Sequence, residues 1–401
     1  MAGKVVYLCG RRDQTAQCLA ESAGRVGIEF DSIEMGWTSG DSLPHLDEIR
    51  AHSRARLPET GIAGLLAGDR ISAICAAYLA ERLGLAFHPV EAMETCAQRL
   101  LARERLKASG IAVAPAFLVS TMAGHEDALH RTAFPCVLKP VRFTGGQGVM
   151  RADTPDEFRD VYNRLRRMTG EQRHEFILVE EYIEGDEFAF HGFCISGRLH
   201  PLALLDKPAG KMGPSFADVI VTSPSRQPRD ITAELMRTAE RAVSAMRLEN
   251  GPVSVEMRWN GRRACVLEIN PFLPAPPVCR ALSPKCRNAV AEAMLLASAG
   301  LAAPALETHH AAGVGYLALP WPGVFEGIEG TGRALAVEGV DEIIPFMETG
   351  QSGVPPPAGN QRAAAVTARA PTADEAECAI REALSMLSVR MRTARFAGAA
   401  G

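Results

Sequence analysis

Residues 253–270, VSVEMRWNGRRACVLEIN, decide the fold of this chain and the chemistry it can support. The stretch reads as two strands joined at an Asn-Gly pair, which is typical of a tight β-hairpin turn. Glu256 on the first strand, with Glu268 and Asn270 at the end of the second, offers carboxylate and amide oxygens. Hard oxygen donors suit magnesium, which otherwise prefers water and substrate phosphates. The hairpin therefore predicts chemistry on a nucleotide triphosphate.

The register of this hairpin decides whether the two glutamates can share an ion. Side chains alternate across a strand, so Glu268 and Asn270 lie on one face. A strict two-residue turn sets Glu256 opposite Cys265 and turns Glu268 away. An odd-length loop centred near Arg262, or a β-bulge, sets Glu256 opposite Glu268 instead. Facing carboxylates repel without a cation, which favours a metal over the alternative of an exposed edge hairpin with ordinary acids.

The bulk composition bounds the class of protein. A chain of 401 residues is long enough for two or three domains with their own cores. The formal net charge of −4, with mixed signs, gives no electrostatic reason to expect nucleic acid or an anionic membrane as partner. No apolar run reaches spanning length, and the N-terminus lacks the pattern of a signal peptide. The ten cysteines form no Cys-x-x-Cys pair and are expected to be reduced thiols in a cytoplasmic protein.

Apolar runs predict a small N-terminal α/β domain of alternating strands and helices, without a dinucleotide-binding glycine pattern after its first strand. A single charged amphipathic helix is expected over 95–108, ending at Gly110. Another helix is expected to begin at Thr154, which precedes a Pro and two acids. The other predicted elements are strands near 116–120, 135–140, 176–180, 314–319 and 364–368, helices over 231–247 and 373–387, and a loop over 350–360.

A second motif has the composition of a phosphate grip. Lys139 ends a buried strand in residues 134–140, FPCVLKP, and residues 144–148, TGGQG, follow closely. Glycines let backbone N–H groups approach phosphate oxygens, and a lysine adds a point charge. The Gly-Lys-Ser/Thr order of a Walker loop is absent, and an ordinary turn after a strand is the alternative.

A third motif, residues 177–188, ILVEEYIEGDEF, is a strand that ends in acids, turns at Gly185 and restarts at Glu187. A nucleotide base needs a backbone donor and acceptor at a strand end, and its sugar needs a carboxylate for two hydroxyl groups. Residues 180–183 and Glu187 offer both. A solvated acidic turn is the alternative for this segment taken alone.

These motifs occur in an order and at spacings that resemble the ATP-grasp superfamily, and within it the carboxylate–amine (amino-acid) ligases. The resemblance also takes in LAERLGL, the helix before Gly110 and the C-terminal VGYLALPWPG, so it covers nearly the whole chain. It implies an α/β (α+β ATP-grasp) fold: an N-terminal Rossmann-like α/β domain over 1–95, a two-lobed ATP-grasp domain over 96–300 with a mobile lid at about 110–183, and a small C-terminal α/β domain over 301–401.

The resemblance also implies a role for each matching residue. Those expected to contact ATP phosphates are Lys139, Lys207 and a mobile loop of Gly145, Gly146, Gln147 and Gly148. Lys139 is also expected to be catalytic. Those expected at the adenine and ribose are Glu180, Glu181, Tyr182, Ile183 and Glu187. Those expected to hold two magnesium ions, for which manganese is a substitute, are Glu256, Glu268 and Asn270.

Two positions depart from the pattern of the superfamily. Arg99 stands where relatives carry a second lysine, and we expect it to bind phosphate because it keeps the charge. Phe272 stands where many relatives carry an arginine that faces the transferred phosphate or the substrate carboxylate. Arg258, Arg280 and Lys285 are the candidates to supply that charge from elsewhere.

The resemblance implies an ATP- and magnesium-dependent ligase that joins a carboxylic acid to an amine, such as an amino acid, through an acyl phosphate. An enzyme of the purine or carboxylase type, with a different acceptor, is one alternative. The other alternative is an ATP-binding protein that has lost catalytic activity. Phe272 and Arg99, the two departures from the pattern, support this alternative. Both partners are expected to be small molecules, and a homodimer is the default expectation for the assembly.

Overall fold

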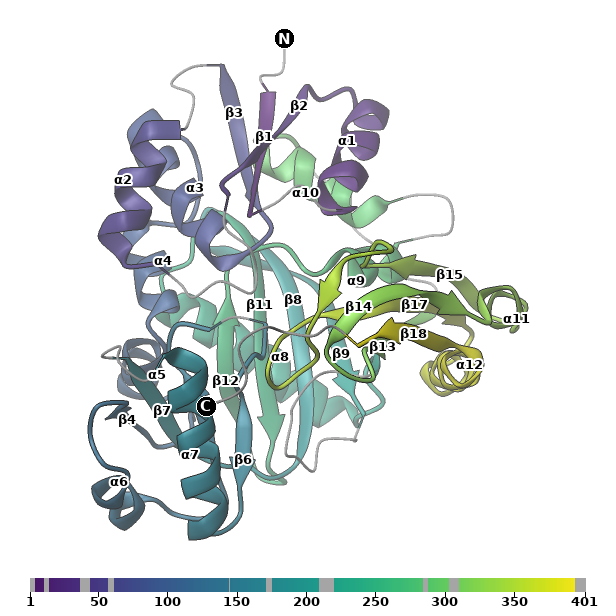
Figure 1. Ribbon diagram of the computed structural model, residues 1–401. Helices are drawn as coiled ribbons and strands as arrows, with labels where there is room; N and C mark the ends of the chain where they lie inside the picture. Colours follow the sequence, from purple (N-terminus) through teal and green to yellow (C-terminus); the bar gives the residue numbers. More distant parts are fainter. Residues whose placement is uncertain are drawn as a thin grey trace.

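The computed structural model describes residues 4–10, 14–36, 44–56, 61–143, 145–170, 175–208, 220–283, 288–302 and 310–393. Within these ranges the strands form four sheets, and Figure 1 shows how they are arranged. A small sheet lies near the N-terminus, a long sheet runs through the centre, and two further sheets lie beside it.

The N-terminal sheet is parallel, with the order β2-β1-β3. Its strands are β1 (Lys4–Cys9), β2 (Phe30–Glu34) and β3 (Ile62–Ala67), and its helices are α1 (Gln14–Val26), α2 (Leu46–Arg56) and α3 (Arg70–Leu83). Val6 and Leu8 of β1 belong to one core cluster, whereas Val5 and Tyr7 belong to another. Successive side chains thus enter cores on opposite faces, as expected for a covered parallel sheet. The predicted alternating α/β organisation is confirmed here.

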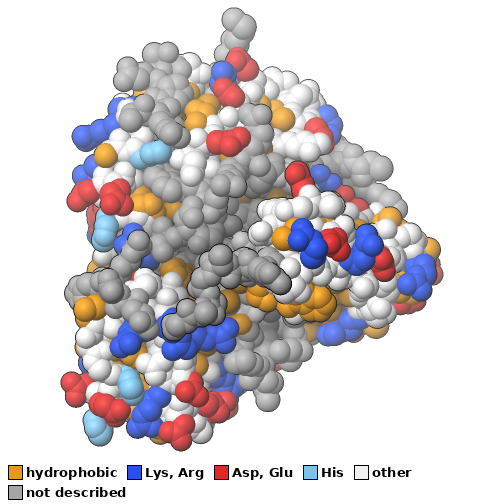
Figure 2. Space-filling view, viewed as in Figure 1, with side chains coloured by type: hydrophobic (Ala, Val, Ile, Leu, Met, Phe, Trp, Pro, Cys, Tyr) orange, Lys and Arg blue, Asp and Glu red, His pale blue; other side chains and the backbone are white. Residues whose placement is uncertain are grey.

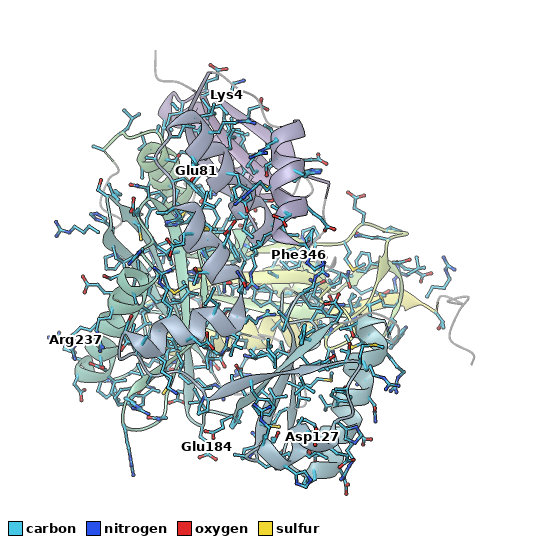
Figure 3. The ribbon with its side chains drawn as sticks, turned by 90° about the vertical axis from the view of Figure 1, so that its left-hand side faces the viewer. Lys4, Glu81, Asp127, Glu184, Arg237 and Phe346 are labelled. Atoms are coloured by element: carbon cyan, nitrogen blue, oxygen red, sulfur yellow. The ribbon has the colours of Figure 1, made fainter. Side chains whose placement is uncertain are left out.

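Residues 116–181, which lie within the predicted lid and are called the lid below, contain an antiparallel sheet with the order β4-β7-β5-β6. The strands are β4 (Ala116–Ser120), β5 (Cys136–Pro140), β6 (Met150–Ala152) and β7 (Phe176–Glu181), and the helices are α6 (Glu126–Arg131) and α7 (Pro155–Thr169). The hydroxyl of Thr154 accepts the Glu157 N–H, which confirms the predicted helix start. Phe158, Tyr162 and Leu165 of α7 are fully buried in the core of this lobe. Figure 3 places Asp127 of α6 in this lobe, away from Arg237.

The central sheet has eight strands in the order β12-β11-β8-β9-β10-β13-β17-β15. These are β8 (Asp186–Ile195), β9 (Arg198–Lys207), β10 (Ile220–Ser223), β11 (Gly251–Trp259), β12 (Ala264–Asn270), β13 (Ala311–Ala318), β15 (Val340–Pro345) and β17 (Arg362–Ala370). Strands from both sides of residue 300 pair directly, because β10 is antiparallel to β13. The predicted domain boundary at residue 300 therefore separates strands of one continuous sheet. This boundary remains a proposal.

The remaining elements cover this sheet and its C-terminal end. They are α8 (Arg229–Ala245), α9 (Pro276–Leu282), α10 (Ala289–Ser298), α11 (Thr331–Leu335), α12 (Ala373–Met386), β14 (Gly323–Glu329), β16 (Ser352–Gly353) and β18 (Ser388–Arg392). The last three strands form their own sheet in the order β16-β14-β18. On the face shown in Figure 2, acidic and basic side chains are interspersed.

The single helix predicted over 95–108 is wrong in one respect. The structure has two helices there, α4 (Val90–Ala97) and α5 (Arg99–Ala108), separated by Gln98 in an extended conformation. No Gly or Pro marks the break. The break makes Arg99 the first residue of α5, and its guanidinium is buried in contact with the lid.

Candidate active site

The hairpin of β11 and β12 brings the predicted carboxylates together. Glu256 pairs with Glu268, whereas the next pair is Met257 with Val266, so Leu267 is the extra residue of a bulge. The predicted facing pair and the predicted bulge are thus confirmed. The odd-length loop is wrong, because four residues, 260–263, connect the strands. The side chain of Asn260 explains this loop, since its oxygen accepts two backbone N–H groups, at 3.1 and 3.0 Å.

The bulge is held by the segment that leads into the lid. Its extra residue, Leu267, accepts a hydrogen bond of 3.1 Å from Arg103 of α5. The neighbouring Val266 N–H donates to the carbonyl of Ala112 at 2.8 Å. The orientation of Glu268 therefore depends on a buried arginine more than 160 residues earlier in the chain.

Two arginines surround Glu268. Arg70, the first residue of α3, forms an ion pair with it and also donates to Asn270 Oδ1 at 3.1 Å. Arg99 Nε lies 3.4 Å from the same carboxylate. Burial would raise the pKa of Glu268, but Arg99, Arg70 and Lys139 hold it well below its usual range. Glu268 is therefore a permanent carboxylate, as a metal ligand must be.

The facing Glu256 belongs to a second group of charges. Lys207 Nζ lies 3.2 Å from Glu256 Oε1 and 3.2 Å from Glu187 Oε1. Arg258 contacts the other oxygen of Glu187 at 2.9 Å and donates to the Ile183 carbonyl at 2.7 Å. Burial would lower the pKa of Arg258, but the Glu187 carboxylate raises it above its ordinary value. The predicted ribose residue thus lies between two cations on neighbouring strands.

The lid contributes a third group around Glu180. Its carboxylate forms ion pairs with Lys139 at the end of β5 and with Arg103 of α5. Burial would raise the pKa of Glu180, but Arg103 and Lys139 hold it below its usual range. The predicted adenine residue and the predicted phosphate lysine therefore contact each other directly. Lys139 also lowers the pKa of Glu268, so the lid and the hairpin share one electrostatic environment.

The segment between β7 and β8 is shaped by its backbone. Glu181 and Tyr182 donate their N–H groups to the carbonyls of Pro115 and Pro135, both at 3.0 Å. The Tyr182 ring lies between two guanidinium groups, 4.1 Å from that of Arg151 and 4.7 Å from that of Arg258. A Cβ on Gly185 would come within 1.9 Å of a backbone oxygen, so only glycine fits this turn.

The glycine-rich loop contacts the C-terminal part of the chain. The Gly148 N–H donates to the Pro357 carbonyl at 2.9 Å, and Gln147 Nε2 donates to the Ala358 carbonyl at 2.9 Å. A Cβ on Gly148 would lie 2.6 Å from Pro140, and its φ of 70° is left-handed. The segment over 350–360, predicted to be a loop from its Gly and Pro content, contains the short strand β16, and its residues 357–358 contact the glycine-rich loop.

The candidate phosphate-binding residues Arg99 and Arg280 have partners within the chain. Arg99 donates to the carbonyls of Pro140, Val141 and Phe143, at 2.7, 2.9 and 3.0 Å, so much of its donor capacity already holds the end of β5. Arg280 forms an ion pair of 2.7 Å with Glu342 of β15. Lys285 lies outside the described residues.

Phe272, at the position where relatives carry an arginine, packs against the largest core cluster. Two arginines that were not predicted from the sequence contact the site carboxylates: Arg70 pairs with Glu268, and Arg103 pairs with Glu180. Arg70 follows directly on the turn after β3, and ligands of α/β sheets bind at the carboxyl ends of strands. This position at the carboxyl end of β3 is the sequence feature from which Arg70 could have been predicted as a site residue. Arg103 stands one helical turn after Arg99, on the buried face of α5.

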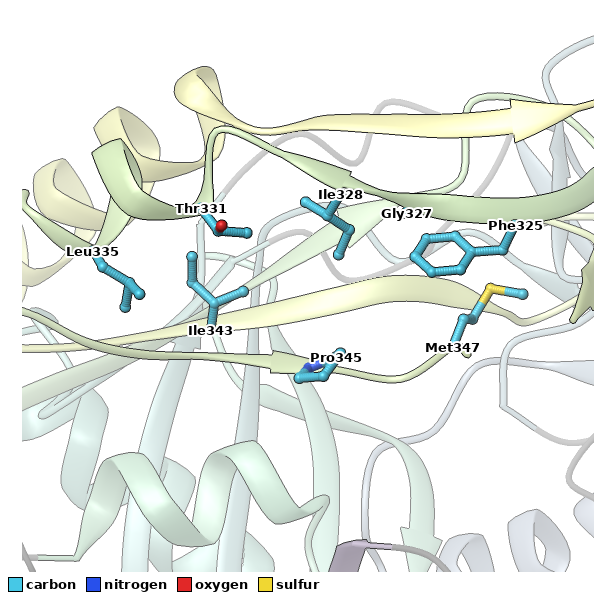
Figure 4. Close-up of a pocket in the computed structure, with 8 residues that line it drawn as sticks. All are labelled: Phe325, Gly327, Ile328, Thr331, Leu335, Ile343, Pro345 and Met347. Atoms are coloured by element: carbon cyan, nitrogen blue, oxygen red, sulfur yellow. The ribbon is translucent and has the colours of Figure 1, made fainter. Parts of the chain in front are cut away.

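A cavity of about 280 Å³ lies apart from these charges, in the C-terminal part of the chain (Figure 4). Its lining is mostly apolar and consists of Phe325, Gly327, Ile328, Thr331, Leu335, Ile343, Pro345 and Met347. None of these is a predicted site residue, so the charged hairpin, not this cavity, is the candidate active site.

Comparison with known proteins agrees with this geometry. The model of the ATP-grasp domain matches residues 132–276, which include the glycine-rich loop and the hairpin. The chain has an ATP-grasp domain. A second model, of the L-amino acid ligase C-terminal domain 2, matches residues 315–392. The resemblance drawn from the motifs is thereby confirmed, as is the α/β ATP-grasp fold class.

The similarity to solved structures extends over nearly the whole chain. L-amino acid ligase from Bacillus licheniformis superimposes with a TM-score of 0.79 at 20% identity, over 98% of this chain and 99% of that one. Carboxyaminoimidazole ribonucleotide synthase from Aspergillus clavatus, complexed with ATP, has a TM-score of 0.71 at 17% identity, over 96% and 99%. These identities show a shared fold. The predicted enzyme class, an ATP-dependent ligase, agrees with the kinds of enzyme found.

A curated relative matches part of the chain. Human carnosine synthase 1 is 24% identical over 215 residues, which is 49% of this chain and 26% of that protein. The chain thus matches about a quarter of the length of this relative.

The residues at the hairpin fit a hard divalent cation. Glu256 and Glu268 face each other, and Asn270 lies two residues further along β12, on the face of Glu268. Among the described residues, no group of three or more His, Cys, Asp or Glu side chains is placed to hold a metal, so oxygens of the nucleotide would complete such a site. In the same part of the chain, no helix is both long and apolar enough to cross a membrane.

Proposed function

We propose that this chain is an ATP- and magnesium-dependent carboxylate–amine ligase that forms an amide bond and releases ADP and phosphate. The observation that carries the proposal is the bulged hairpin, which sets Glu256 opposite Glu268 beside the Lys139 and Glu180 ion pair of the lid. A matching C-terminal domain of L-amino acid ligases supports the choice of an amine acceptor.

In the proposed reaction, an oxygen of the carboxylic acid attacks the γ-phosphorus, and ADP leaves. The amine then attacks the carbonyl carbon of the acyl phosphate, the C–O bond to phosphate breaks, and the amine loses a proton. No protein nucleophile is required, so the chain acts by positioning and by charge. When bound, magnesium offsets the charge that develops on the phosphate oxygens. Glu256, Glu268 and Asn270 would hold it.

The charged groups of the chain then have separate tasks. When the nucleotide enters, Lys139 would leave Glu180 and bind phosphate oxygens. Lys207 would leave Glu187 and Glu256 and do the same. Glu180 would then accept a hydrogen bond from the adenine amino group, Glu187 would accept hydrogen bonds from the ribose hydroxyls, and Glu256 would hold magnesium. Arg258 stays between Glu187 and the Ile183 carbonyl and so orients the ribose residue.

Exclusion of water is the remaining requirement, because an acyl phosphate hydrolyses readily. The contacts of Gln147 and Gly148 with the segment at 357–358 support a role for this segment as the surface against which the lid closes.

The ligase is tested by ADP and phosphate release from Mg-ATP across a matrix of small carboxylic acids and amino acids. Release that requires one acid and one amine together is the expected result. Release driven by bicarbonate or by an aminoimidazole nucleotide would favour the purine or carboxylase type, which the likeness to carboxyaminoimidazole ribonucleotide synthase keeps as the second candidate. ATP binding with no release under any combination would favour a decayed site.

A further inference from the structure

Arg70 contacts two of the three predicted magnesium ligands at once. Its terminal nitrogen NH2 pairs with Glu268 Oε1 and donates to Asn270 Oδ1 at 3.1 Å. One nitrogen thus lies between the two oxygens, and a metal ion shared by the same two side chains would need that place. The Arg70 guanidinium therefore places a positively charged donor between these two oxygens.

The surrounding structure fixes Arg70 at this position. Asp69 caps α3, since its Oδ1 accepts the Ser72 N–H at 2.9 Å. The Leu273 N–H donates to the carbonyl of Ala67 at 3.0 Å, which ties the end of β3 to the segment that follows β12. Arg70 itself is 7% exposed. The contact between Arg70 and the ligands is therefore built into the interface of two parts of the chain.

The two carboxylates differ in their access to a metal ion. Glu268 lies against the buried Arg70 and Arg99 and is 25% exposed at its side chain. Glu256 is 34% exposed and is contacted by Lys207, a lysine that a phosphate can attract away. Arg70 covers the face shared by Glu268 and Asn270, so an ion held by both glutamates would lie on the side of Glu256.

We propose that Arg70 takes the place of a second metal ion, so that the chain binds its nucleotide with a single divalent cation between Glu256 and Glu268. The proposal rests on the proposed nucleotide-binding function. It departs from the two ions that the motif pattern implies and leaves Asn270 to Arg70 in place of a metal ion. Arg70 also supplies near the phosphates the positive charge that Phe272 lacks. Its other terminal nitrogen, NH1, is buried without a hydrogen-bond partner among the described residues, and it would donate to a phosphate oxygen.

The number of bound ions tests the proposal without any acid or amine substrate. The full chain is saturated with ADP and titrated with Mn²⁺, and free Mn²⁺ is counted by electron paramagnetic resonance. Wild-type protein is expected to bind one nucleotide-dependent ion. Arg70→Ala and the longer neutral variant Arg70→Gln are expected to bind two, whereas Arg70→Lys stays at one. Arg105→Ala, which removes a partly exposed arginine paired with the exposed Glu91, is the matched control and stays at one.

Each outcome has a separate meaning. Two ions on the wild-type protein, or one ion on both neutral variants, would overturn the role of Arg70. No nucleotide-dependent ion on the wild-type protein would overturn this proposal together with the nucleotide site. A count of one that rises to two in the neutral variants supports the proposal even if no acid and amine are ever joined, in which case the ligase reaction alone is wrong. If Arg70→Ala fails to fold, Arg70→Gln and the wild-type count decide.

Discussion

Glu180 and Glu268 are carboxylates that each pair with two cations, the first buried and the second 25% exposed, yet their partners come from different distances in the chain. Glu180 pairs with Lys139 of the adjacent strand β5 and with Arg103. Glu268 pairs with Arg99 and with Arg70, which begins a helix of the N-terminal domain. The first site is assembled from β5, β7 and α5, whereas the second depends on the packing of α3 against the hairpin. The comparison teaches that the surroundings of Glu180 come from neighbouring elements, whereas those of Glu268 require a helix from about 200 residues earlier in the chain.

The largest expected effect is the loss of turnover in Glu268→Gln, which distinguishes the proposed role of Glu268 from that of Glu180. Glu268→Gln removes a charge that would hold the metal, so turnover should fall on the order of 1,000-fold, as when a transition-state charge partner is lost. Glu180→Gln should mainly raise the KM for ATP, because this carboxylate would contact the base. Steady-state ADP release measures both variants. Retained ATP turnover in the Glu268 variant would refute the metal assignment.

Arg103 joins the two regions, because it contacts Glu180 of the lid and the Leu267 carbonyl of the bulge. Arg103→Ala leaves a buried carboxylate with one partner fewer, and we expect the unfolding free energy to fall by about 3 kcal/mol. Arg105→Ala on the same helix breaks an exposed pair with Glu91 and should cost about 0–1 kcal/mol. Urea denaturation of both variants gives the comparison. Equal losses would show that Arg103 has no special structural role.

The lid loop offers a matched pair of glycines. Gly148→Ala places a Cβ 2.6 Å from Pro140 at a left-handed φ of 70°, and strain of about 1–3 kcal/mol should disturb the loop and raise the KM for ATP. Gly146 has a φ of 77°, but its Cβ would meet nothing within 4 Å. Gly146→Ala should therefore show a smaller increase. A larger increase for Gly146→Ala would contradict the packing role of Gly148.

The smallest expected effect is a difference in acid sensitivity. The pKa values of Glu180 and Glu268 are lowered in the folded chain relative to the ordinary value of 4.5. Their contribution to stability is therefore complete above about pH 4.5 and is lost as the pH falls through the lowered values. The unfolding free energy of Glu268→Gln should consequently decline less between pH 5 and about pH 3 than that of the wild type. Parallel curves would show that Glu268 gains no stabilising partner on folding.

The sequence predicted the parts of this site that depend on neighbours along the chain. The strand end at Lys139, the acidic turn after β7 and the need for a bulge all follow from local spacing. Arg70 was missed because its partners lie about 200 positions away, and Arg103 because nothing local shows that its side chain is buried. The break at Gln98 was missed for a related reason, since no Gly or Pro marks it and Arg99 bonds to carbonyls more than 40 residues away.

The transfer of oxygen from the acid to phosphate tests the central claim most directly. The acid found in the substrate matrix is labelled with ¹⁸O at both carboxylate oxygens, and the phosphate and amide products are analysed by mass spectrometry. An acyl phosphate formed at the hairpin predicts one ¹⁸O atom in the phosphate for each amide bond, with the other kept in the amide. Phosphate without ¹⁸O would show that the acid is not phosphorylated and would contradict the proposed ligase reaction.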